Sequence, residues 1–471
     1  MSYLFVSIGG TGAKIMESLT HFCIAGTFPT DEKLYIAAID PDVGNGNLER
    51  TSTALNNYVV FQNFAVGNDS VLFKNKISVL KPFPWNPTGH DKTLDDLISF
   101  HQYKNSPVGK LYETLYTRRE RSTTLNEGFR GHPSIGAAVL AKNFDDGRIW
   151  ATLTAQIEKI LGEGEVLKIF LAGSVFGGTG AAGLPTIARL LRDNLRDYAD
   201  RISIGAVLVL PYFSFSPENQ HMDELFARSE NFLANTKAAL KYYSERENIF
   251  DAIYFVGDEN LTPVAEFSVG AANQRNEAHI VELYAALAAE NFFARPIHAS
   301  KTFKYVCHHE KNRFAWQDLP NAAEDFSLND RFVQFARFIF AYIHLIKPVL
   351  SDLVAGNAKT YKYPWFVDYL EGINLTSQDV VNFNFYAEAF VAWLKQLETL
   401  DGREVFLIDS AMFESNPAKL VDKKLFSALD GNKTSLDVRE VWYRLTEPCK
   451  IDSSAKGFGK FLRRLYDSCA V

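Results

Sequence analysis

Two glycine-rich segments carry the residues of this chain that are best suited to hold an anion. They are residues 8–14, with the sequence IGGTGAK, and residues 176–183, with the sequence FGGTGAAG. Glycine tolerates positive φ and lets backbone amide groups come close to an anion. Each segment follows an apolar stretch and precedes an expected helix, whose N-terminus is the positive end of the helix dipole. The two segments therefore predict two phosphate-binding turns.

The second segment is the more informative of the two. Residues 167–174 form an apolar run that predicts a buried strand, and residues 184–196 have apolar side chains at helical spacing. Ser174, Thr179 and the loop amides have the groups that an anion-binding nest needs. One such turn is common, but two in one α/β unit indicate a nucleotide held from both sides. The alternative is a pair of tight strand-to-helix turns without a ligand.

Two acids follow another expected strand. Residues 34–39 are apolar, and Asp40 and Asp42 come directly after them. An acid at the carboxyl end of a parallel strand suits either a metal-bound water or a ribose hydroxyl. The alternative is a solvated turn at the end of the strand.

Residues 177–183 resemble the signature loop of the tubulin/FtsZ superfamily, and the order of expected elements agrees with it over about the first 295 residues. The chain is similar in particular to the tubulin-like proteins of bacteria. This resemblance implies an α/β fold with a doubly wound, mostly parallel sheet and a long core helix. The superfamily's second domain normally contains a small mixed sheet, whereas the residues beyond about 300 have a mainly helical pattern here, so we expect a largely helical, divergent C-terminal domain. The implied domains are a GTP-binding domain at 1–270, the core helix at 271–295 and the C-terminal domain at 296–471.

The resemblance also implies that GTP or GDP binds together with Mg²⁺. The first loop would contribute Gly9, Gly10, Thr11 and Gly12. The signature loop would contribute Ser174, Gly177, Gly178, Thr179, Gly180 and Ala181. Asp40 and Asp42 would reach Mg²⁺ through water, Arg130 and Gly131 would lie near the γ-phosphate, and Asn235 and Asn276 would read the base.

Some of these assignments have plain structural alternatives. The loop at 128–136 is equally consistent with an ordinary glycine-rich surface loop, and Asn235 with a solvent-facing helical residue. Asn276 is expected to open the core helix. An Asn side chain pairs with either purine, so guanine over adenine follows from the resemblance alone.

One departure from the superfamily concerns hydrolysis. In polymerising members, the loop after the core helix presents acids to the nucleotide of the next subunit. Here residues 299–304 read ASKTFK, without an Asn-x-Asp-x-x-Asp/Glu pattern. A lysine aids phosphate binding but does not position a water as a carboxylate does. Only an irregular connection would bring an acid to this position, from Glu290, Glu310 or Asp318. Nucleotide binding is therefore better supported than hydrolysis, and no catalytic residue is assigned.

Composition sets the broad class. A length of 471 residues predicts two or three domains, and 47% hydrophobic with 22% charged residues is typical of a soluble globular protein. A net charge of -7 argues against broad nucleic-acid binding. The chain begins with a structural segment, and its four cysteines show neither metal-binding nor disulfide spacing, which favours a reducing cytoplasm.

The remaining segments predict helices and a loop. Residues 332–350 are apolar enough to suggest a membrane span, but they contain two cations and two other polar groups, so we expect a buried or partner-facing helix. Residues 81–87 are rich in proline and aromatic residues and predict an ordered surface loop within an insertion. This loop could cover the nucleotide or contact a partner; the alternative is a plain insertion without such a role. The last third is expected to be helical at 329–354, 379–400, 436–443 and 456–467, with strands only at 301–307 and 404–408.

Three functions from different classes follow. The first is a GTP-binding protein that assembles head to tail with itself or a related subunit. The second is a nucleotide-dependent switch or scaffold of the same fold that does not polymerise and binds another protein through its C-terminal part. The third is a Rossmann oxidoreductase that uses the first loop, with Asp40 on a ribose, and leaves the second loop unexplained.

Overall fold

The computed structural model describes most of the chain. The described residues are 1–28, 32–64, 72–88, 93–126, 128–129, 131–145, 148–215, 229–246, 249–264, 276–296, 303–306, 313–315, 326–398, 404–406, 424–425, 436–447 and 457–470.

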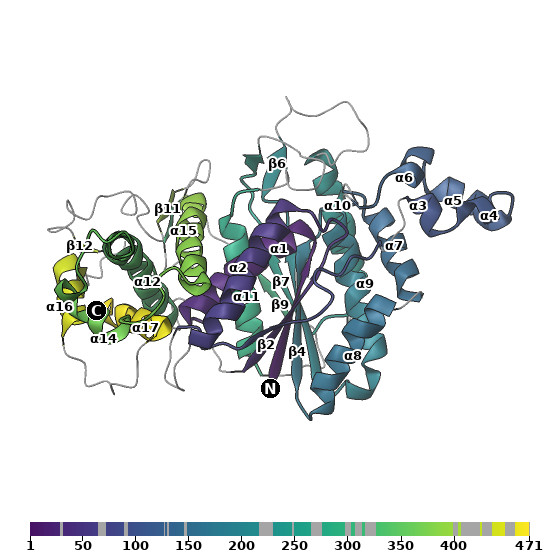
Figure 1. The fold of residues 1–471 in the computed structure, drawn as a ribbon. Helices are drawn as coiled ribbons and strands as arrows, with labels where there is room; N and C mark the ends of the chain where they lie inside the picture. The colour runs from purple at the N-terminus through teal and green to yellow at the C-terminus, as the bar shows by residue number, and fades with distance from the viewer. Residues whose placement is uncertain are drawn as a thin grey trace.

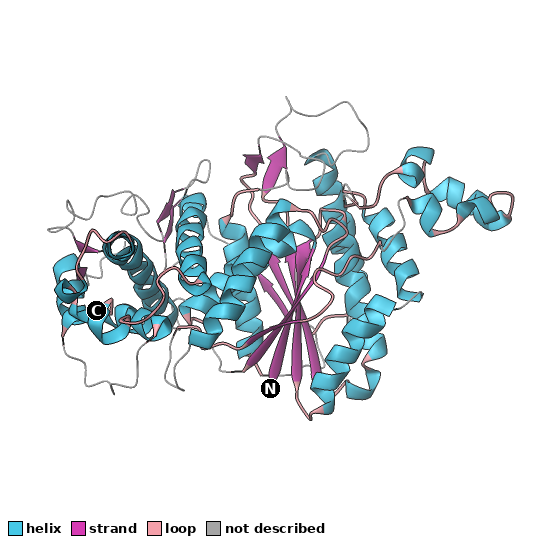
Figure 2. Cartoon of the chain, in the orientation of Figure 1, coloured by secondary structure: helices cyan, strands magenta, loops and turns pink. Residues whose placement is uncertain are grey.

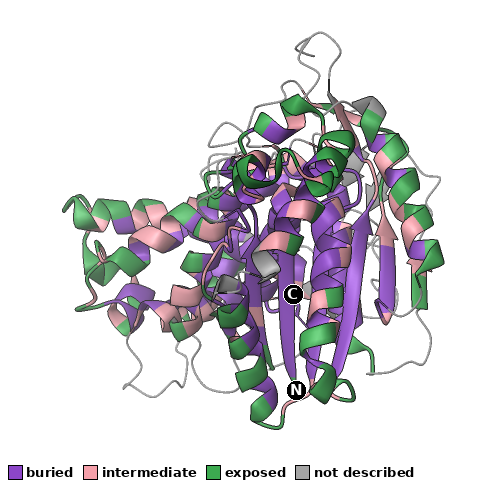
Figure 3. Cartoon of the chain, turned by 90° about the vertical axis from the view of Figure 1, so that its right-hand side faces the viewer, coloured by how far each residue is buried: buried purple, intermediate pink, exposed green. Residues whose placement is uncertain are grey.

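A seven-stranded parallel sheet forms the centre of the molecule (Figure 1). Its strands, in spatial order, are β3 (Ile77–Val79), β2 (Lys33–Ile39), β1 (Ser2–Ile8), β4 (Leu167–Ser174), β5 (Ile202–Val209), β7 (Ala252–Val256) and β9 (Phe303–Val306). The central strands are buried on both faces, as Figure 3 shows, which explains their continuous apolar sequences. Along β1, Tyr3 and Phe5 face one core while Leu4, Val6 and Ile8 face the other.

Helices cover both faces of this sheet (Figure 2). On one face lie α1 (Gly9–Ala25), α2 (Gly46–Phe61) and α11 (Ile280–Ala294). On the other lie α7 (Pro133–Asp145), α8 (Arg148–Gly162), α9 (Thr179–Asn194) and much of α10 (Ser229–Glu245). The doubly wound α/β class expected from the sequence is confirmed. The core helix begins at Ile280, so Asn276 precedes it rather than opening it.

The segment between α2 and α7 has two parts. The short helices α3 (Leu94–Leu97), α4 (Phe100–Tyr103), α5 (Pro107–Leu115) and α6 (Arg118–Ser122) build a small core of their own with α7 and project from the sheet (Figure 1). The run at 81–87 is different, because Trp85 is buried against Trp150 and its amide donates to Ala38 O. The expectation of a surface loop is therefore wrong for Trp85, which extends the pairing of β2.

The C-terminal part is largely helical, as expected. It contains α12 (Phe326–Ala341), a π-helical turn at Tyr342–Ile346, α13 (Lys347–Val354), α14 (Pro364–Tyr369), α15 (Gln378–Glu398), α16 (Val438–Thr446) and α17 (Phe458–Ser468). Short strand pairs join β6 (Phe213–Phe215) to β8 (Thr262–Val264), β10 (Arg313–Ala315) to β11 (Glu404–Phe406), and β12 (Lys424–Leu425) to β13 (Leu436–Asp437). The strand expected at 301–307 is β9, which joins the main sheet. The domain boundaries stay a prediction.

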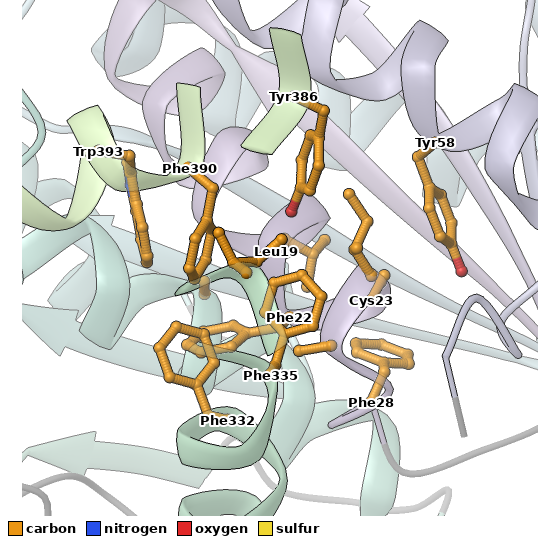
Figure 4. Packing of buried hydrophobic residues seen from close by; sticks show 14 of the residues in the cluster. Leu19, Phe22, Cys23, Phe28, Tyr58, Phe332, Phe335, Tyr386, Phe390 and Trp393 are labelled. Atoms are coloured by element: carbon orange, nitrogen blue, oxygen red, sulfur yellow. The ribbon is translucent and has the colours of Figure 1, made fainter. Parts of the chain in front are cut away.

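An aromatic core joins this helical part to the sheet unit. Figure 4 shows Phe22 of α1 between rings from α12 and α15, among them Phe332 and Phe390. In the described part of the chain one continuous helix, Arg331–Val354, has the length and composition of a membrane span, but 67% of its most apolar window is buried inside the protein. It packs on α1 and α17, as a core helix does.

Candidate functional site

The two glycine segments follow neighbouring strands at the point where the winding of the sheet reverses. The chain leaves β1 for α1 on one face and leaves β4, which pairs with β1, for α9 on the other face. In open α/β sheets, ligands bind outside the carboxyl ends of the strands at such a point.

Contact distances confirm that the two segments meet. A Cβ atom placed on Gly9, whose φ is +72°, would lie 3.1 Å from Thr179 Cβ and 3.5 Å from Gly180 N. A Cβ atom on Gly173, at the end of β4, would lie 3.4 Å from Gly180 Cα. Segments far apart in the sequence therefore form one surface above β1 and β4.

Several of these positions have no space for a side chain. A Cβ atom on Gly180 would lie 2.5 Å from Ser174 O and 2.8 Å from Ser174 N, and one on Gly12 would lie 2.6 Å from Ala172 O. Backbone atoms cannot yield at these distances. A Cβ atom on Gly177 would lie 2.9 Å from Ser174 Oγ, which places that hydroxyl beside the loop.

The helices that leave the two loops have no side-chain caps. Ile8 is the N-cap of α1 and Gly178 is the N-cap of α9, and neither gives a side-chain hydrogen bond to the first turn. Thr11 and Ala181 lie half-buried in these first turns. By contrast, α2 is capped by Asn45, whose side chain accepts from Asn47 N. Two uncapped N-termini directed at one place favour an anion.

The two predicted acids lie beside the first loop and are buried. Asp40 Oδ1 accepts from Asp42 N at 3.0 Å, and Asp42 Oδ1 accepts from Gly44 N at 3.2 Å. Asp40 Oδ2 is buried without a hydrogen-bond partner among the described residues. Burial raises the pKa of Asp40 to about 8; the charge of Asp42 adds to the rise and the hydrogen bond from its backbone opposes it.

This donor set fits Mg²⁺ that keeps most of its water. The described residues hold no cluster of three or more His, Cys, Asp or Glu side chains around a common point. Mg²⁺ is commonly held by one or two carboxylates together with waters and substrate phosphates. The unsatisfied oxygen of Asp40 is the atom that such a hydrated ion would satisfy.

Two asparagines that were not singled out from the sequence also lie at the first loop. Asn45 and Asn47 are buried, and their Nδ2 atoms lie 3.5 and 3.9 Å from the position of a Cβ atom on Gly10. Asn47 Oδ1 also accepts from Asn276 N at 2.8 Å. The signal in the sequence was Asn45-Gly46-Asn47 after the acidic strand end, which is typical of a helix start.

Asn276 is held to α2 by its main chain. Besides the bond from its amide to Asn47, its carbonyl accepts from Arg50 Nη1 at 3.0 Å. Arg50 also forms a bidentate ion pair with Glu17 of α1. The segment before α11 is thus fixed beside the first loop.

Asn235 lies on α10 and faces two loops. Its Nδ2 donates to Phe176 O at 3.0 Å and to Gly131 O at 3.2 Å. Both amide hydrogens are therefore used by main-chain carbonyls. Arg130 lies outside the described residues.

A buried polar network lies beneath the first loop. Lys14 of α1 forms an ion pair with Glu282 in the first turn of α11. Glu282 Oε1 accepts from the Tyr212 hydroxyl at 2.6 Å, and Glu282 Oε2 accepts from His279 N at 2.9 Å. Tyr212 also interacts with the side chain of Thr11 in the loop. The network ties the first loop to the start of the core helix.

These features define a class: a doubly wound α/β protein with two glycine loops and an acid at its topological switch point. Residues 94–303 match the model of a protein family described as Tubulin like, so this segment is similar to the tubulin/FtsZ superfamily. A comparison with curated protein sequences found no match.

Several solved structures are similar to the chain at low identity. CetZ from Methanosaeta thermophila strain DSM 6194 is 15% identical, with 62% of this chain and 51% of that chain covered and a TM-score of 0.26. The GDP-bound monomer of CetZ1 from Haloferax volcanii is 11% identical, with 55% and 51% covered and a TM-score of 0.26. A point mutant of FtsZ from M. jannaschii is 14% identical, with 54% and 46% covered and a TM-score of 0.24. The chain spans about half the length of these structures.

Proposed function

We propose that this protein binds GTP or GDP with Mg²⁺ and assembles head to tail, with weak or partner-dependent hydrolysis. The observation that carries the proposal is the meeting of two uncapped helix N-termini above β1 and β4, beside the buried carboxyl group of Asp40 with its unsatisfied oxygen. A triphosphate with a hydrated cation matches that combination of positive dipoles and acid. The superfamily match of residues 94–303 supports guanine as the base.

Each loop has a role in this proposal. Amides of residues 9–12 and 177–181 hold the phosphates, with the hydroxyls of Thr11, Ser174 and Thr179 nearby. Asp40 and Asp42 orient the waters of Mg²⁺, which neutralises phosphate charge when bound. Asn276 lies beside the first loop and is the remaining candidate for a base contact. Arg130 keeps its proposed γ-phosphate role by resemblance.

Hydrolysis has little support from the chain's own acids. Glu290 is buried within α11, where it faces the core rather than a neighbouring subunit. Glu310 and Asp318 lie outside the described residues, as do residues 299–302. An acid for the γ-phosphate of a neighbouring subunit would have to come from those segments or from a partner.

The missing acid pattern favours a second candidate, a switch or scaffold of the same fold that binds GTP without polymerising. Its partner would be another protein at the C-terminal part. Most aromatic side chains there are buried in the core, but Tyr361, Phe385 and Tyr443 are exposed. The oxidoreductase alternative gives no role to the second loop, and the superfamily match disfavours it. A cytoplasmic location is proposed for both candidates.

Two measurements test the proposal. The protein is purified under native conditions, denatured, and the released small molecules are separated and identified. Guanine nucleotide at near one equivalent supports the proposal; absence of any nucleotide, together with no binding of added GTP, rejects it.

The second measurement separates filament from switch. Sedimentation and electron microscopy are compared in GTP and in GDP at high protein concentration. Filaments that pellet in GTP support head-to-tail assembly, in which contacts between unlike surfaces build open polymers. If the pelleted fraction is the same in GTP and in GDP and only monomers are seen, the filament is rejected and the switch is the remaining candidate.

A further inference from the structure

Asn235 is placed to join two loops of the site rather than to contact a base. It lies in the middle of α10 and is half-buried. Its side-chain nitrogen donates to Phe176 O, in the signature loop, and to Gly131 O, in the loop before α7. An amide nitrogen has two hydrogens, so a ligand could meet only the oxygen of this side chain.

The two loops that Asn235 joins also touch each other directly. A Cβ atom on Gly178 would lie 2.9 Å from Phe129 Cβ, 3.0 Å from Phe129 C and 3.1 Å from Gly131 N. Phe129 is buried in the small core formed by α3 to α7. The main chain at Gly178 therefore lies against the buried Phe129, while Asn235 holds the same loop two residues earlier, at Phe176.

The loop at 128–131 needs such an external support. Gly128 and Gly131 have φ of +82° and +77°, which turn the chain sharply. As glycines, these two residues have no side chains that could pack against the protein. The described contacts of this loop include the His132 N to Phe129 O bond, the packing of Phe129, the close approach of Gly178 and the bond from Asn235. The Asn235 side chain adds a hydrogen-bonded link from Gly131 to Phe176 of the signature loop.

Resting on the proposed function, we infer that Asn235 is a positioning residue that sets the spacing of the two phosphate-side loops. Its contribution is to the affinity for the phosphates, transmitted through Gly131 and Phe176. The preference for guanine over adenine does not depend on it. This role differs from the base contact that the resemblance implied for Asn235.

The test separates phosphate affinity from base preference. Binding of GTP, guanosine and ATP is measured by calorimetry for the wild type and for Asn235→Ala and Asn235→Asp. The Asp variant keeps the shape and removes both donors. In both variants we expect GTP to bind on the order of tenfold more weakly, because two hydrogen bonds are lost, while guanosine binding is unchanged. The ratio of the guanosine to the GTP dissociation constant should therefore fall on the order of tenfold, and the ratio of the ATP to the GTP dissociation constant should stay unchanged.

Two further variants control for folding. Asn235→Gln keeps both donors and should recover part of the loss, whereas Leu233→Ala changes an exposed residue of the same helix and should bind like the wild type. Thermal unfolding of each variant shows whether it folds. Loss of guanine preference with the phosphate ratio intact would overturn the inference in favour of a base contact, and so would unchanged binding in both Ala and Asp variants.

Hydrogen exchange tests the same inference without nucleotide. In the ligand-free protein, Asn235→Asp should speed amide exchange at 131–134 and at 176–180 while leaving the amides of α8 unchanged. Unchanged exchange in both loops overturns the inference. Failure of the wild type to bind GTP or ATP would instead reject the proposed function, so the two failures are distinguishable.

Discussion

At the scale of single residues, the signature loop needs glycine because neighbouring atoms leave no space for a side chain, and not because the loop has to be flexible. Gly180 lies against the backbone of Ser174, where even a methyl group has no space. Gly162, near the end of α8, has open space around it. The pair therefore gives a matched comparison within helices on the same face of the sheet.

Gly180→Ala should lower the free energy of unfolding by about 1–3 kcal/mol and weaken GTP binding, because the loop must shift to admit the methyl group. Gly162→Ala should be neutral or raise stability by up to about 1 kcal/mol, since alanine favours helix. Urea unfolding and GTP titration of both variants provide the check. Equal stability and binding in the two would contradict the loop geometry.

Asp40→Asn should reduce the effect of Mg²⁺ on nucleotide affinity on the order of 10- to 100-fold, because a neutral amide no longer attracts the hydrated ion. Nucleotide affinity in the presence of EDTA should change little. Titrations with and without Mg²⁺ measure both quantities, and Asp193→Asn, which changes an exposed surface acid, serves as the control. The same Mg²⁺ dependence in wild type and Asp40→Asn would remove Asp40 from the metal site.

Single residues also mark the limits of sequence reasoning. The acid at 40 and the glycines at 9–12 and 177–180 could be singled out from local pattern, and the structure places them together. The partners of Asn235 could not, because Gly131 and Phe176 come from other segments. The proline and aromatic residues around Trp85 are typical of a surface loop, whereas its pairing with β2 depends on a distant contact.

At the scale of elements, the start of α11 is fixed to the first loop through buried charges. Lys14 and Glu282 are both almost fully buried, and Glu282 also accepts hydrogen bonds from Tyr212 and His279. At the other end of α11, Lys168 of β4 donates to Phe293 O and to Arg295 O. A cation at a helix C-terminus is favourable, so α11 is tied to the rest of the sheet unit at both ends.

Lys14→Met should lower the free energy of unfolding by about 3–5 kcal/mol, because it leaves the carboxylate of Glu282 buried without its cation. The double variant Lys14→Met with Glu282→Gln should recover most of the loss, since no charge remains buried and the Gln oxygen still accepts hydrogen bonds. Urea unfolding of the two single variants and the double variant measures the coupling. Additive losses would show that the two residues do not act as a pair.

At the scale of the whole molecule, the sheet unit and the C-terminal helices share one core. His21 of α1 lies in it, with Nδ1 3.1 Å from the Tyr386 hydroxyl and its ring against Trp393. Burial lowers the pKa of His21 from 6.5 to about 3, and the charge of Arg50 adds to the effect. The folded protein therefore holds this imidazole neutral where an unfolded chain would protonate it.

Stability should consequently fall as the pH drops below about 6.5 toward 3, by up to about 1.4 kcal/mol per pH unit, because the unfolded state binds the extra proton. His21→Gln should flatten this part of the profile, while His101→Gln, on the exposed side of α4, should leave it unchanged. Urea unfolding between pH 7 and pH 5 supplies the measurement. A profile that His21→Gln does not alter would contradict this account.

The sequence by itself determined the local parts of this protein: apolar strands, glycine turns, an acid at a strand end and helices at the C-terminus. These follow from periodicity and from the backbone freedom of glycine, which are properties of neighbouring residues. The tertiary structure decided that β1 and β4 are adjacent, that Asn235 donates its hydrogen bonds to two loops, and that α1 packs against the C-terminal helices. Such facts depend on which distant surfaces pack together, because burial is settled by the whole chain and not by any one segment.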